Sequence, residues 1–250
     1  MSPVFEVVLL LGRPACGKSE FLDYMQKQPP ERLRQRYGLG RLIILDDFPL
    51  LWEKFEEDDI LERLGLPRLW SRVAEPSYTT THPLIWPFLT EKLNLAARKV
   101  LAPGAFRPGE ETLLIEFSRG GPSGYRDALA RFDPGILARA AILYIEVSHA
   151  ESCRRNRARY DEARKSSILA HSVPEEAMQG IYATDDWPEL TAAGTGYLAV
   201  GGLRVPYATM NNEPESTDPV VLDGRYHRAL ATLMERWQAR GATAGFLLTP

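Results

Sequence analysis

The stretch Gly12-Arg13-Pro14-Ala15-Cys16-Gly17-Lys18-Ser19 decides the fold of this 250-residue chain. It has the spacing GxxxxGK[ST] without a mismatch, and a chain of this composition would contain roughly 0.003 such matches by accident. An apolar run at residues 4–11 leads directly into Gly12, and a helical pattern at residues 18–28 follows it. A strand, a glycine-containing loop and a helix are the context that this spacing requires.

The quoted loop has the chemistry of an anion-binding site. Its glycines let successive backbone N–H groups point inward, and the N-terminus of the following helix adds partial positive charge. Lys18 is placed to reach the β- and γ-phosphates of a nucleoside triphosphate, and Ser19 to ligate magnesium. We therefore expect the eight loop residues, together with Glu20, to bind ATP and Mg²⁺.

The rest of the sequence predicts an α/β fold. Further short apolar runs lie at residues 41–45, 112–117, 141–147 and 205–210, and helical patterns at 83–102, 124–139, 150–170 and 219–240. Near-continuous apolar strands that alternate with helices are typical of a parallel sheet covered on both faces. The last helix repeats apolar residues every three or four positions, which predicts one buried face made of Leu222, Tyr226, Leu230, Leu233 and Trp237.

Two regions are too long to be simple connections between strands. Residues 48–110 contain an acidic stretch and three tryptophans, whereas residues 148–204 contain a cluster of arginines. Insertions at the strand ends of an open α/β sheet are where substrate-covering segments belong. We expect one α/β domain over residues 1–250, with a helical substrate- or partner-binding insertion at 48–110 and a lid region at 148–204.

Composition excludes several classes of protein. Hydrophobic residues are 44% and charged residues 25% of the chain, which is typical of a globular domain, and the net charge is −3. That balance argues against a nucleic-acid coat or a polybasic membrane binder. The longest apolar runs fall far short of the roughly 18–20 residues that span a bilayer. We expect a cytoplasmic protein with a small-molecule partner and with no nucleic-acid or membrane partner.

The second apolar run ends in Asp46-Asp47-Phe48, which has two interpretations. Asp46 could be the acid that holds magnesium at the end of a Walker B strand. Alternatively, an Asp beside the anion-binding loop could accept the proton of a substrate hydroxyl. Asp46 lies only 28 residues after Lys18, and this spacing favours the second interpretation. An acidic turn without a function stays open.

The third and fourth runs are also followed by charged residues. Glu116 ends the third run and is a candidate to orient magnesium, while Arg119 and Arg126 are candidates to contact substrate. After the fourth run, Arg155 and Arg159 share one helix face. They could neutralise charge on a transferring phosphoryl group as part of a mobile lid, with Arg154 on the nucleotide. A solvated strand end for Glu116 and a solvated helix face for the arginines remain the alternatives.

The order of these features resembles that of the P-loop small-molecule kinases, the nucleoside and nucleotide kinase group that includes uridine kinase-like and nicotinamide riboside kinase-like enzymes. In that group the second strand ends in an acid–aromatic sequence whose Asp is the catalytic base, and Asp46-Asp47-Phe48 resembles it. Residues 207–213 are similar to its adenine-contacting loop, which implies that Asn211 contacts the nucleotide. The resemblance implies a three-layer P-loop NTPase fold with a five-stranded parallel sheet of order 2-3-1-4-5 and an arginine-rich lid. Residues 50–110 match no substrate-binding segment of the group.

The sequence therefore predicts an ATP- and Mg²⁺-dependent phosphotransferase that acts on a small hydroxyl or phosphate acceptor; the resemblance alone implies nucleosides or nucleotides. Candidate catalytic residues are Lys18, Asp46, Asp47, Arg155 and Arg159; candidate substrate contacts are Asp46, Phe48, Arg119 and Arg126; candidate metal ligands are Ser19, Asp46 and Glu116. The alternatives are a P-loop ATPase or ATP-gated switch whose insertion binds a protein, and a nucleotide-binding module without catalysis. A concave pocket that faces the loop would favour the kinase, and a flat apolar face would favour a protein partner.

Overall fold

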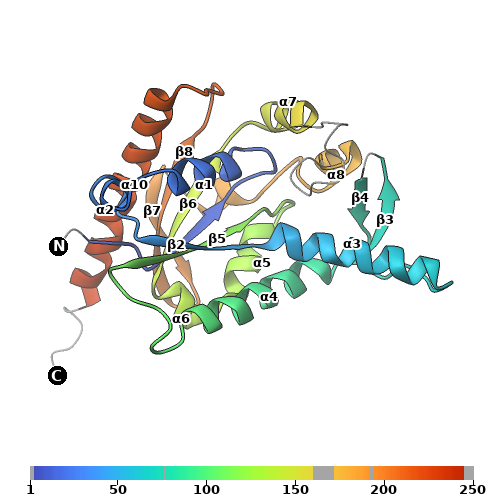
Figure 1. Cartoon of the computed structure of the whole chain (residues 1–250), viewed down its shortest axis with the longest axis horizontal. Helices are drawn as coiled ribbons and strands as arrows, with labels where there is room; N and C mark the ends of the chain where they lie inside the picture. Colours follow the sequence, from blue (N-terminus) through green and yellow to red (C-terminus); the bar gives the residue numbers. More distant parts are fainter. Residues whose placement is uncertain (1–2, 76, 160–171, 192–193, 245–250) are drawn as a thin grey trace.

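The computed structural model describes residues 3–75, 77–159, 172–191 and 194–244. A six-stranded sheet lies at its centre, with helices on both faces (Figure 1). The strands are β1 (Val7–Leu11), β2 (Arg41–Asp46), β5 (Glu111–Phe117), β6 (Ala140–Glu146), β7 (Thr195–Val200) and β8 (Leu203–Asn211). Five of them are parallel in the order β2-β5-β1-β6-β8, and β7 pairs antiparallel with β8 at the edge.

The predicted α/β organisation is confirmed, and each of the five apolar runs forms a parallel strand. The prediction of a purely parallel five-stranded sheet is wrong, because β7 adds a sixth, antiparallel strand. A Gly201-Gly202 turn joins β7 to β8, and both glycines have positive φ, at 55° and 80°. Such a turn suits a tight hairpin. Most of β7 is only half-buried at the sheet edge, and its apolar residues 197–200 lie between Gly196 and the Gly201-Gly202 turn.

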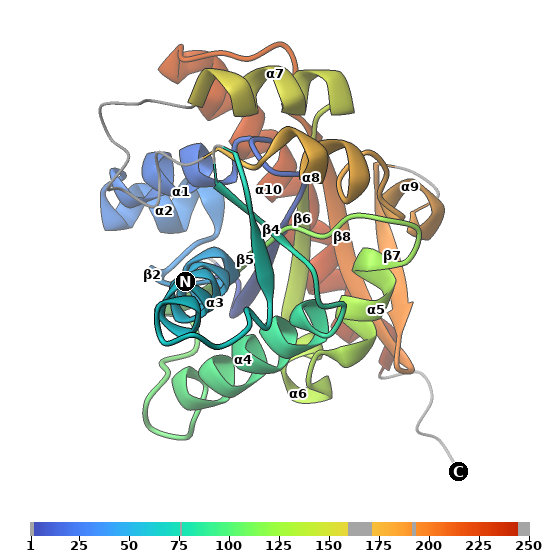
Figure 2. The same cartoon turned by 90° about the vertical axis from the view of Figure 1, so that its right-hand side faces the viewer.

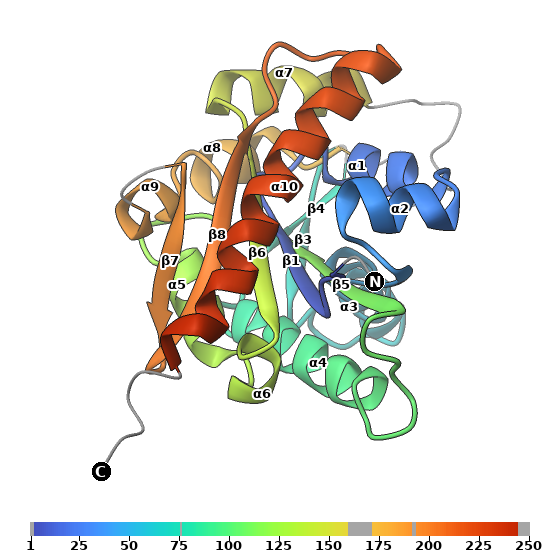
Figure 3. The same ribbon diagram turned by 90° about the vertical axis from the view of Figure 1, so that its left-hand side faces the viewer.

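Alternating residues of β1 face the two helical layers. Val8 and Leu10 pack in the cluster on one face, together with residues of α1 (Lys18–Gln26), α2 (Pro30–Tyr37) and α10 (Pro219–Ala244). Figure 3 shows α10 crossing this face of the sheet. Four of the five residues predicted for the buried face of the last helix are buried, and Trp237 packs against the same cluster.

The opposite face is covered by α4 (Ile85–Val100), α5 (Gly124–Arg131) and α6 (Pro134–Leu137). Val7, Leu9 and Leu11 of β1 point into this second cluster, as the two-residue period of a strand requires. The sheet is therefore buried on both sides, and its carboxyl edge carries the polar residues discussed below.

Residues 48–110 contain most of α3 (Asp47–Arg63) and all of α4, and also a hairpin that was not predicted. The long helix α3 packs on α4 through aromatic and aliphatic side chains, and the hairpin of β3 (Ser71–Ala74) and β4 (Ser77–Thr80) stands beside both helices (Figures 1 and 2). Asp58 of α3 is fully buried and accepts hydrogen bonds from the backbone N–H groups of residues 69–71, at 2.7–3.0 Å. This carboxylate ties the hairpin to α3.

Residues 148–204, the region predicted to be a lid, include α7 (His149–Arg159), α8 (Glu175–Gly180) and α9 (Trp187–Leu190). The helix predicted over residues 150–170 is present up to Arg159, and its remainder lies outside the described residues. In the part of the chain that the structure describes, no helix combines the length and the apolar character needed to cross a membrane.

Candidate functional site

The GxxxxGK[ST] loop joins β1 to α1, as its sequence predicted. Gly12 and Gly17 have φ angles of 146° and 105°, which L side chains rarely adopt. A Cβ atom on Gly12 would lie 2.5 Å from the carbonyl oxygen of Ile145, and one on Gly17 would lie 2.4 Å from Nδ2 of Asn212. The two glycines therefore permit both the turn and its close packing against β6 and the segment after β8.

Lys18 lies across the loop with only 6% of its surface exposed. Its Nζ donates hydrogen bonds to the carbonyl oxygens of Gly12 and Arg13, both at 3.0 Å, and to Oγ of Ser118 at 2.7 Å. The side chain of Arg13 points elsewhere, to Asp185 at 2.9 Å and to the carbonyl oxygen of Val147 at 3.2 Å. Lys18 thus lies over the loop at the carboxyl end of β5, and Arg13 braces the loop from outside.

Asp46 and Glu116 are register neighbours on β2 and β5. Burial raises the pKa of Asp46 to about 6, against the opposing effects of the Phe48 N–H group and Lys18. Burial raises the pKa of Glu116 to about 7; the charge of Lys18 opposes this shift and that of Asp46 adds to it. Oδ1 of Asp46 accepts a 2.9 Å hydrogen bond from the Phe48 N–H group, so this carboxylate also caps α3. Two protonatable carboxyls therefore lie side by side near Lys18.

Asp47 is held differently from its neighbour. Its Oδ2 lies 2.5 Å from Nη1 of Arg119, and both side chains are at least nine-tenths buried. The guanidinium lies 5.3 Å from the ring centre of Trp86 and 5.1 Å from that of Phe117, and its Nη2 donates to the Thr90 hydroxyl at 3.2 Å. Burial raises the pKa of Asp47, and the charge of Arg119 opposes that shift. Arg119 was predicted to contact substrate, but its guanidinium forms a buried ion pair with Asp47 and does not line the cavity described below.

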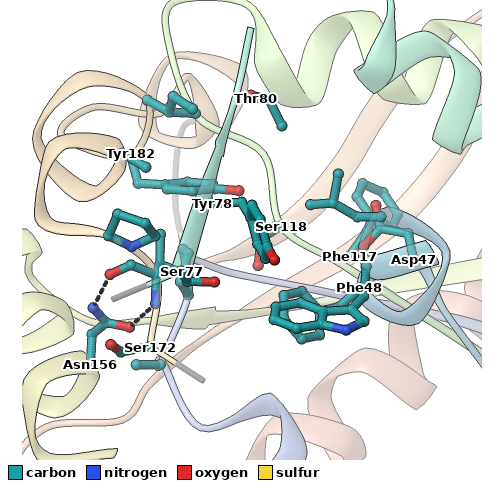
Figure 4. A pocket seen from close by; sticks show the side chains of 18 of the residues that line it. Asp47, Phe48, Ser77, Tyr78, Thr80, Phe117, Ser118, Asn156, Ser172 and Tyr182 are labelled. Carbon is teal, nitrogen blue, oxygen red and sulfur yellow. Dashed lines mark hydrogen bonds between the residues drawn. The ribbon is translucent and has the colours of Figure 1, made fainter. Parts of the chain in front are cut away.

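One cavity of about 250 Å³ joins the loop to the insertion (Figure 4). Its loop end is lined by Lys18, Ser19, Asp46, Asp47 and Glu116. Its other end is lined by six aromatic side chains, Phe48, Trp52, Phe55, Tyr78, Trp86 and Tyr182, and by Ser77, Thr79 and Thr80 of β4. This is the concave pocket facing the loop that would favour a kinase over a protein-binding face.

The structure brings one of the predicted lid arginines to this cavity. Arg159 lines it beside Asn156. Arg155 is only 5% exposed; it donates to Glu151 and, through Nη2 at 2.7 Å, to the carbonyl oxygen of Asn212. Arg154 is exposed on the same helix and pairs with Glu151 and Glu215. Arg154 and Arg155 therefore fasten α7 to the segment after β8.

Three other predicted residues, all outside the loop, lie apart from the cavity lining. Arg126 is exposed on α5. Glu20 is half-buried on α1, and its pKa is raised by burial. Asn211 lines a separate cavity of about 320 Å³ beside Arg13. The neighbouring Asn212 is the residue that contacts the loop, because its Nδ2 donates to the carbonyl oxygen of Cys16 at 2.8 Å.

Sequence reasoning missed several lining residues, among them Tyr78, Ser118, Asn156 and Tyr182. The tryptophans of the insertion marked its region as a candidate, but no local pattern distinguishes Tyr78 from the other aromatic residues there. Its position follows from the pairing of β3 with β4, two strands of four residues each, and so short a pattern does not specify the register.

The donor chemistry at the loop end suits magnesium. The hydroxyl of Ser19 and the carboxylates of Asp46 and Glu116 all line the same cavity and are oxygen donors of the kind that Mg²⁺ prefers. Magnesium is commonly bound through one or two carboxylates together with substrate phosphates. These three side chains therefore fit the predicted metal.

Comparison with known proteins gives likenesses of overall structure. No protein-family model and no curated protein sequence matches the chain. It is similar to a solved structure of an unliganded sugar kinase from a Janibacter species, with 14% sequence identity and a TM-score of 0.43, over 92% of this chain and 96% of that chain. It is also similar to the solved structure of the protein APE1195, with 16% identity and a TM-score of 0.45, over 93% of this chain and 98% of that chain.

Proposed function

We propose that this protein is an ATP-dependent phosphotransferase that moves the γ-phosphoryl group of ATP to a hydroxyl group of a small molecule. One observation carries the proposal: a single cavity contains the GxxxxGK[ST] loop, Asp46 and an aromatic recess formed by the insertion. Residues 48–110 are then the acceptor-binding insertion, and residues 148–204 the lid.

In this proposal the loop binds the triphosphate. Its N–H groups and the N-terminus of α1 attract the phosphates, and Lys18 exchanges its carbonyl partners for the β- and γ-phosphate oxygens. Ser19 and Glu116 are the side chains that would hold Mg²⁺ in this proposal, which leaves Asp46 for the acceptor proton. Bound there, magnesium would neutralise charge on the phosphate oxygens. Arg159 is the lid cation that faces the transferring group.

Asp46 is the better general base of the two neighbouring aspartates. Asp47 already forms an ion pair with the buried guanidinium of Arg119. Asp46 faces the cavity, and its Oδ1 accepts a hydrogen bond from the Phe48 N–H group. The acceptor oxygen forms a bond to the γ-phosphorus, the bond from that phosphorus to the bridging oxygen of ADP breaks, and the hydroxyl proton passes to Asp46. A carboxyl with a pKa of about 6 is mostly ionised at neutral pH and so ready to accept that proton.

The test is ADP release over a panel of small alcohols, sugars, nucleosides and their phosphates, with the phosphorylated product identified by mass spectrometry. We expect acceptor-dependent ADP release with one phosphorylated product per ADP. Asp46→Asn should slow product formation by about 10²–10⁴-fold. Asp23→Asn is the matched control because Asp23 is an exposed aspartate on α1. Equal ADP release with and without every acceptor would contradict the proposal and favour an ATPase.

A further inference from the structure

We infer that the acceptor is an alcohol that carries a flat, apolar ring and bears no phosphate or carboxylate group. This inference rests on the proposed function and chooses between the hydroxyl and phosphate acceptors that the sequence left open. It follows from the side chains at the insertion end of the cavity.

Aromatic rings make up most of that end. Phe48 and Phe55 lie 6.1 and 5.9 Å from the ring centre of Trp52, and Tyr78 lies 5.8 Å from it. Trp86 and Tyr182 form a second aromatic pair, 6.4 Å apart and edge to face. Ring faces and edges of this kind favour a flat partner over a polar, non-planar one. The two groups are contributed by different elements and line the same cavity.

The charges of the cavity disfavour a second anion beside the triphosphate. Among the described lining residues, the cations are Lys18 and Arg159, and the anions are Asp46, Asp47 and Glu116. Lys18 is assigned to the triphosphate and Arg159 to the transferring phosphoryl group. A phosphate on the acceptor would therefore find no further cation among the described lining residues, and toward the loop end it would meet carboxylates, which repel it. The described lining suits a neutral or cationic acceptor.

The polar lining is also unsuited to a molecule with many hydroxyl groups. Asn156 is committed to the backbone of Val173, donating at 2.7 Å and accepting at 2.9 Å (Figure 4). The hydroxyl of Tyr78 donates to Asp59 at 2.6 Å. The hydroxyl of Ser118 is engaged too, because it accepts a hydrogen bond from Nζ of Lys18 at 2.7 Å. Apart from Ser19 at the loop end, the other hydroxyls of the described lining are those of Ser77, Thr79 and Thr80 on β4, and of Ser172 and Tyr182. A ring with one or two polar substituents matches this lining better than a free sugar does.

The experiment compares matched acceptors with the full-length native protein. Its probes are a ribonucleoside, the same nucleoside with a 3′-phosphate, free ribose, and an aryl alcohol with and without a ring carboxylate. Of the ribonucleoside and the uncharged aryl alcohol, the one with the higher kcat/KM should exceed its own phosphorylated or carboxylated form at least tenfold. It should exceed ribose by the same factor; tenfold corresponds to about 1.4 kcal/mol.

Two variants test the cause of this preference. Ser77→Arg places a cation in the cavity and should raise kcat/KM for the 3′-phosphate probe about tenfold. Its control is Thr81→Arg, because Thr81 is exposed and not part of the described lining.

Phe48→Leu should raise KM for the ring alcohols and leave the KM for ATP unchanged. Its control is Leu66→Ala, at an exposed site in the same insertion, which should change neither value.

The outcomes separate the two claims. Turnover that prefers the phosphorylated probe or ribose overturns the inference about the acceptor and leaves the phosphotransferase standing. Equal kcat/KM for charged and uncharged ring alcohols also overturns the inference. ADP release that no probe stimulates overturns the proposed function and, with it, this inference.

Discussion

The two ends of the cavity are built in different ways. At the loop end, Lys18, Asp46 and Glu116 lie at the carboxyl edge of three adjacent parallel strands, β1, β2 and β5, so strand register places them together. At the insertion end, the side chains come from α3, β4, α4 and the segment around α8, and aromatic packing places them. Substitutions at the loop end should therefore affect single chemical steps, whereas those at the insertion end should act through the stability of the insertion.

The largest expected effect is at Lys18. Lys18→Ala removes the cation that stabilises charge on the phosphates, and it should lower kcat/KM by at least 10²–10³-fold, on the order seen for the loss of one such donor. Titration calorimetry with ATP and steady-state ADP release measure the effect. Lys27→Ala is the control, because Lys27 is exposed and pairs only with Asp23 in the described contacts. Unchanged ATP affinity in Lys18→Ala would rule out the loop as the nucleotide site.

Arg119 contacts both ends of the cavity, Asp47 at the loop end and Trp86 at the insertion end, and its loss should lower the stability of the protein more than any other change proposed. Arg119→Ala leaves the Asp47 carboxylate buried without its cation and should lower the free energy of unfolding by about 3–5 kcal/mol. Urea denaturation measures this change. Arg131→Ala is the matched control, since Arg131 is about half exposed and lies 3.6 Å from Glu91. Equal stability of the two variants would show that the Asp47–Arg119 pair does not support the site.

Substitution of Asp58 should lower the free energy of unfolding by less than substitution of Arg119. Burial raises the pKa of this carboxyl, but hydrogen bonds from Ser71, Leu69 and Trp70 outweigh that effect, and the net pKa is lowered. Asp58→Asn should destabilise the protein by about 1.5–3 kcal/mol at pH 7, the range for hydrogen bonds to a charged group. A lowered native pKa stabilises the fold above the unfolded pKa of about 3.9, and this stability is lost as the pH falls through the native pKa.

The pH dependence of the unfolding free energy tests whether the ionised form of Asp58 stabilises the fold. The difference in unfolding free energy between native protein and Asp58→Asn should narrow below about pH 4. The variant should also raise the KM of the acceptor while the affinity for ATP stays the same. Glu57→Gln, at an exposed acid of the same helix, is the control. A constant difference from pH 3 to pH 7 would show that the ionised Asp58 is not what secures the hairpin.

The smallest expected effect is at Arg154. Its ion pairs with Glu151 and Glu215 are exposed, and such pairs contribute about 0–1 kcal/mol. Arg154→Ala should therefore leave kcat and stability nearly unchanged, whereas Arg159→Ala should lower kcat. Parallel steady-state assays of the two variants measure the difference. The reverse order would place the lid cation at Arg154 and contradict the assignment of Arg159.

These contrasts explain which parts were predictable from sequence. Lys18, Asp46 and Glu116 each follow or end an apolar run, and parallel strands bring their carboxyl ends to one edge. Local signals were therefore sufficient to place these three side chains near one another, whereas their roles stay predictions. Arg155 and Arg159 look equivalent on a helical wheel. Only the folded chain shows that the carbonyl of Asn212, 57 residues away, engages Arg155.

The unpredicted parts depend on long-range pairing. β7 lies at a sheet edge and is mostly half-buried; its apolar residues 197–200 are flanked by glycines, and only the pairing with β8 identifies them as a strand. The position of Tyr78 in the cavity depends on the register of the short β3–β4 hairpin. Asp58, which holds that hairpin, belongs to a series of acidic residues, and the sequence alone does not show which of them is buried.

The central claim is that Asp46 takes the proton of the acceptor hydroxyl. Asn is also a good N-terminal cap, so Asp46→Asn keeps the bond from the Phe48 N–H group and removes only the base. Single-turnover phosphoryl transfer, with ATP and the best acceptor of the panel, tests the claim most directly. We expect Asp46→Asn to keep native ATP affinity and to have a transfer rate lower by about 10²–10⁴-fold. A transfer rate within threefold of that of the native protein would contradict it.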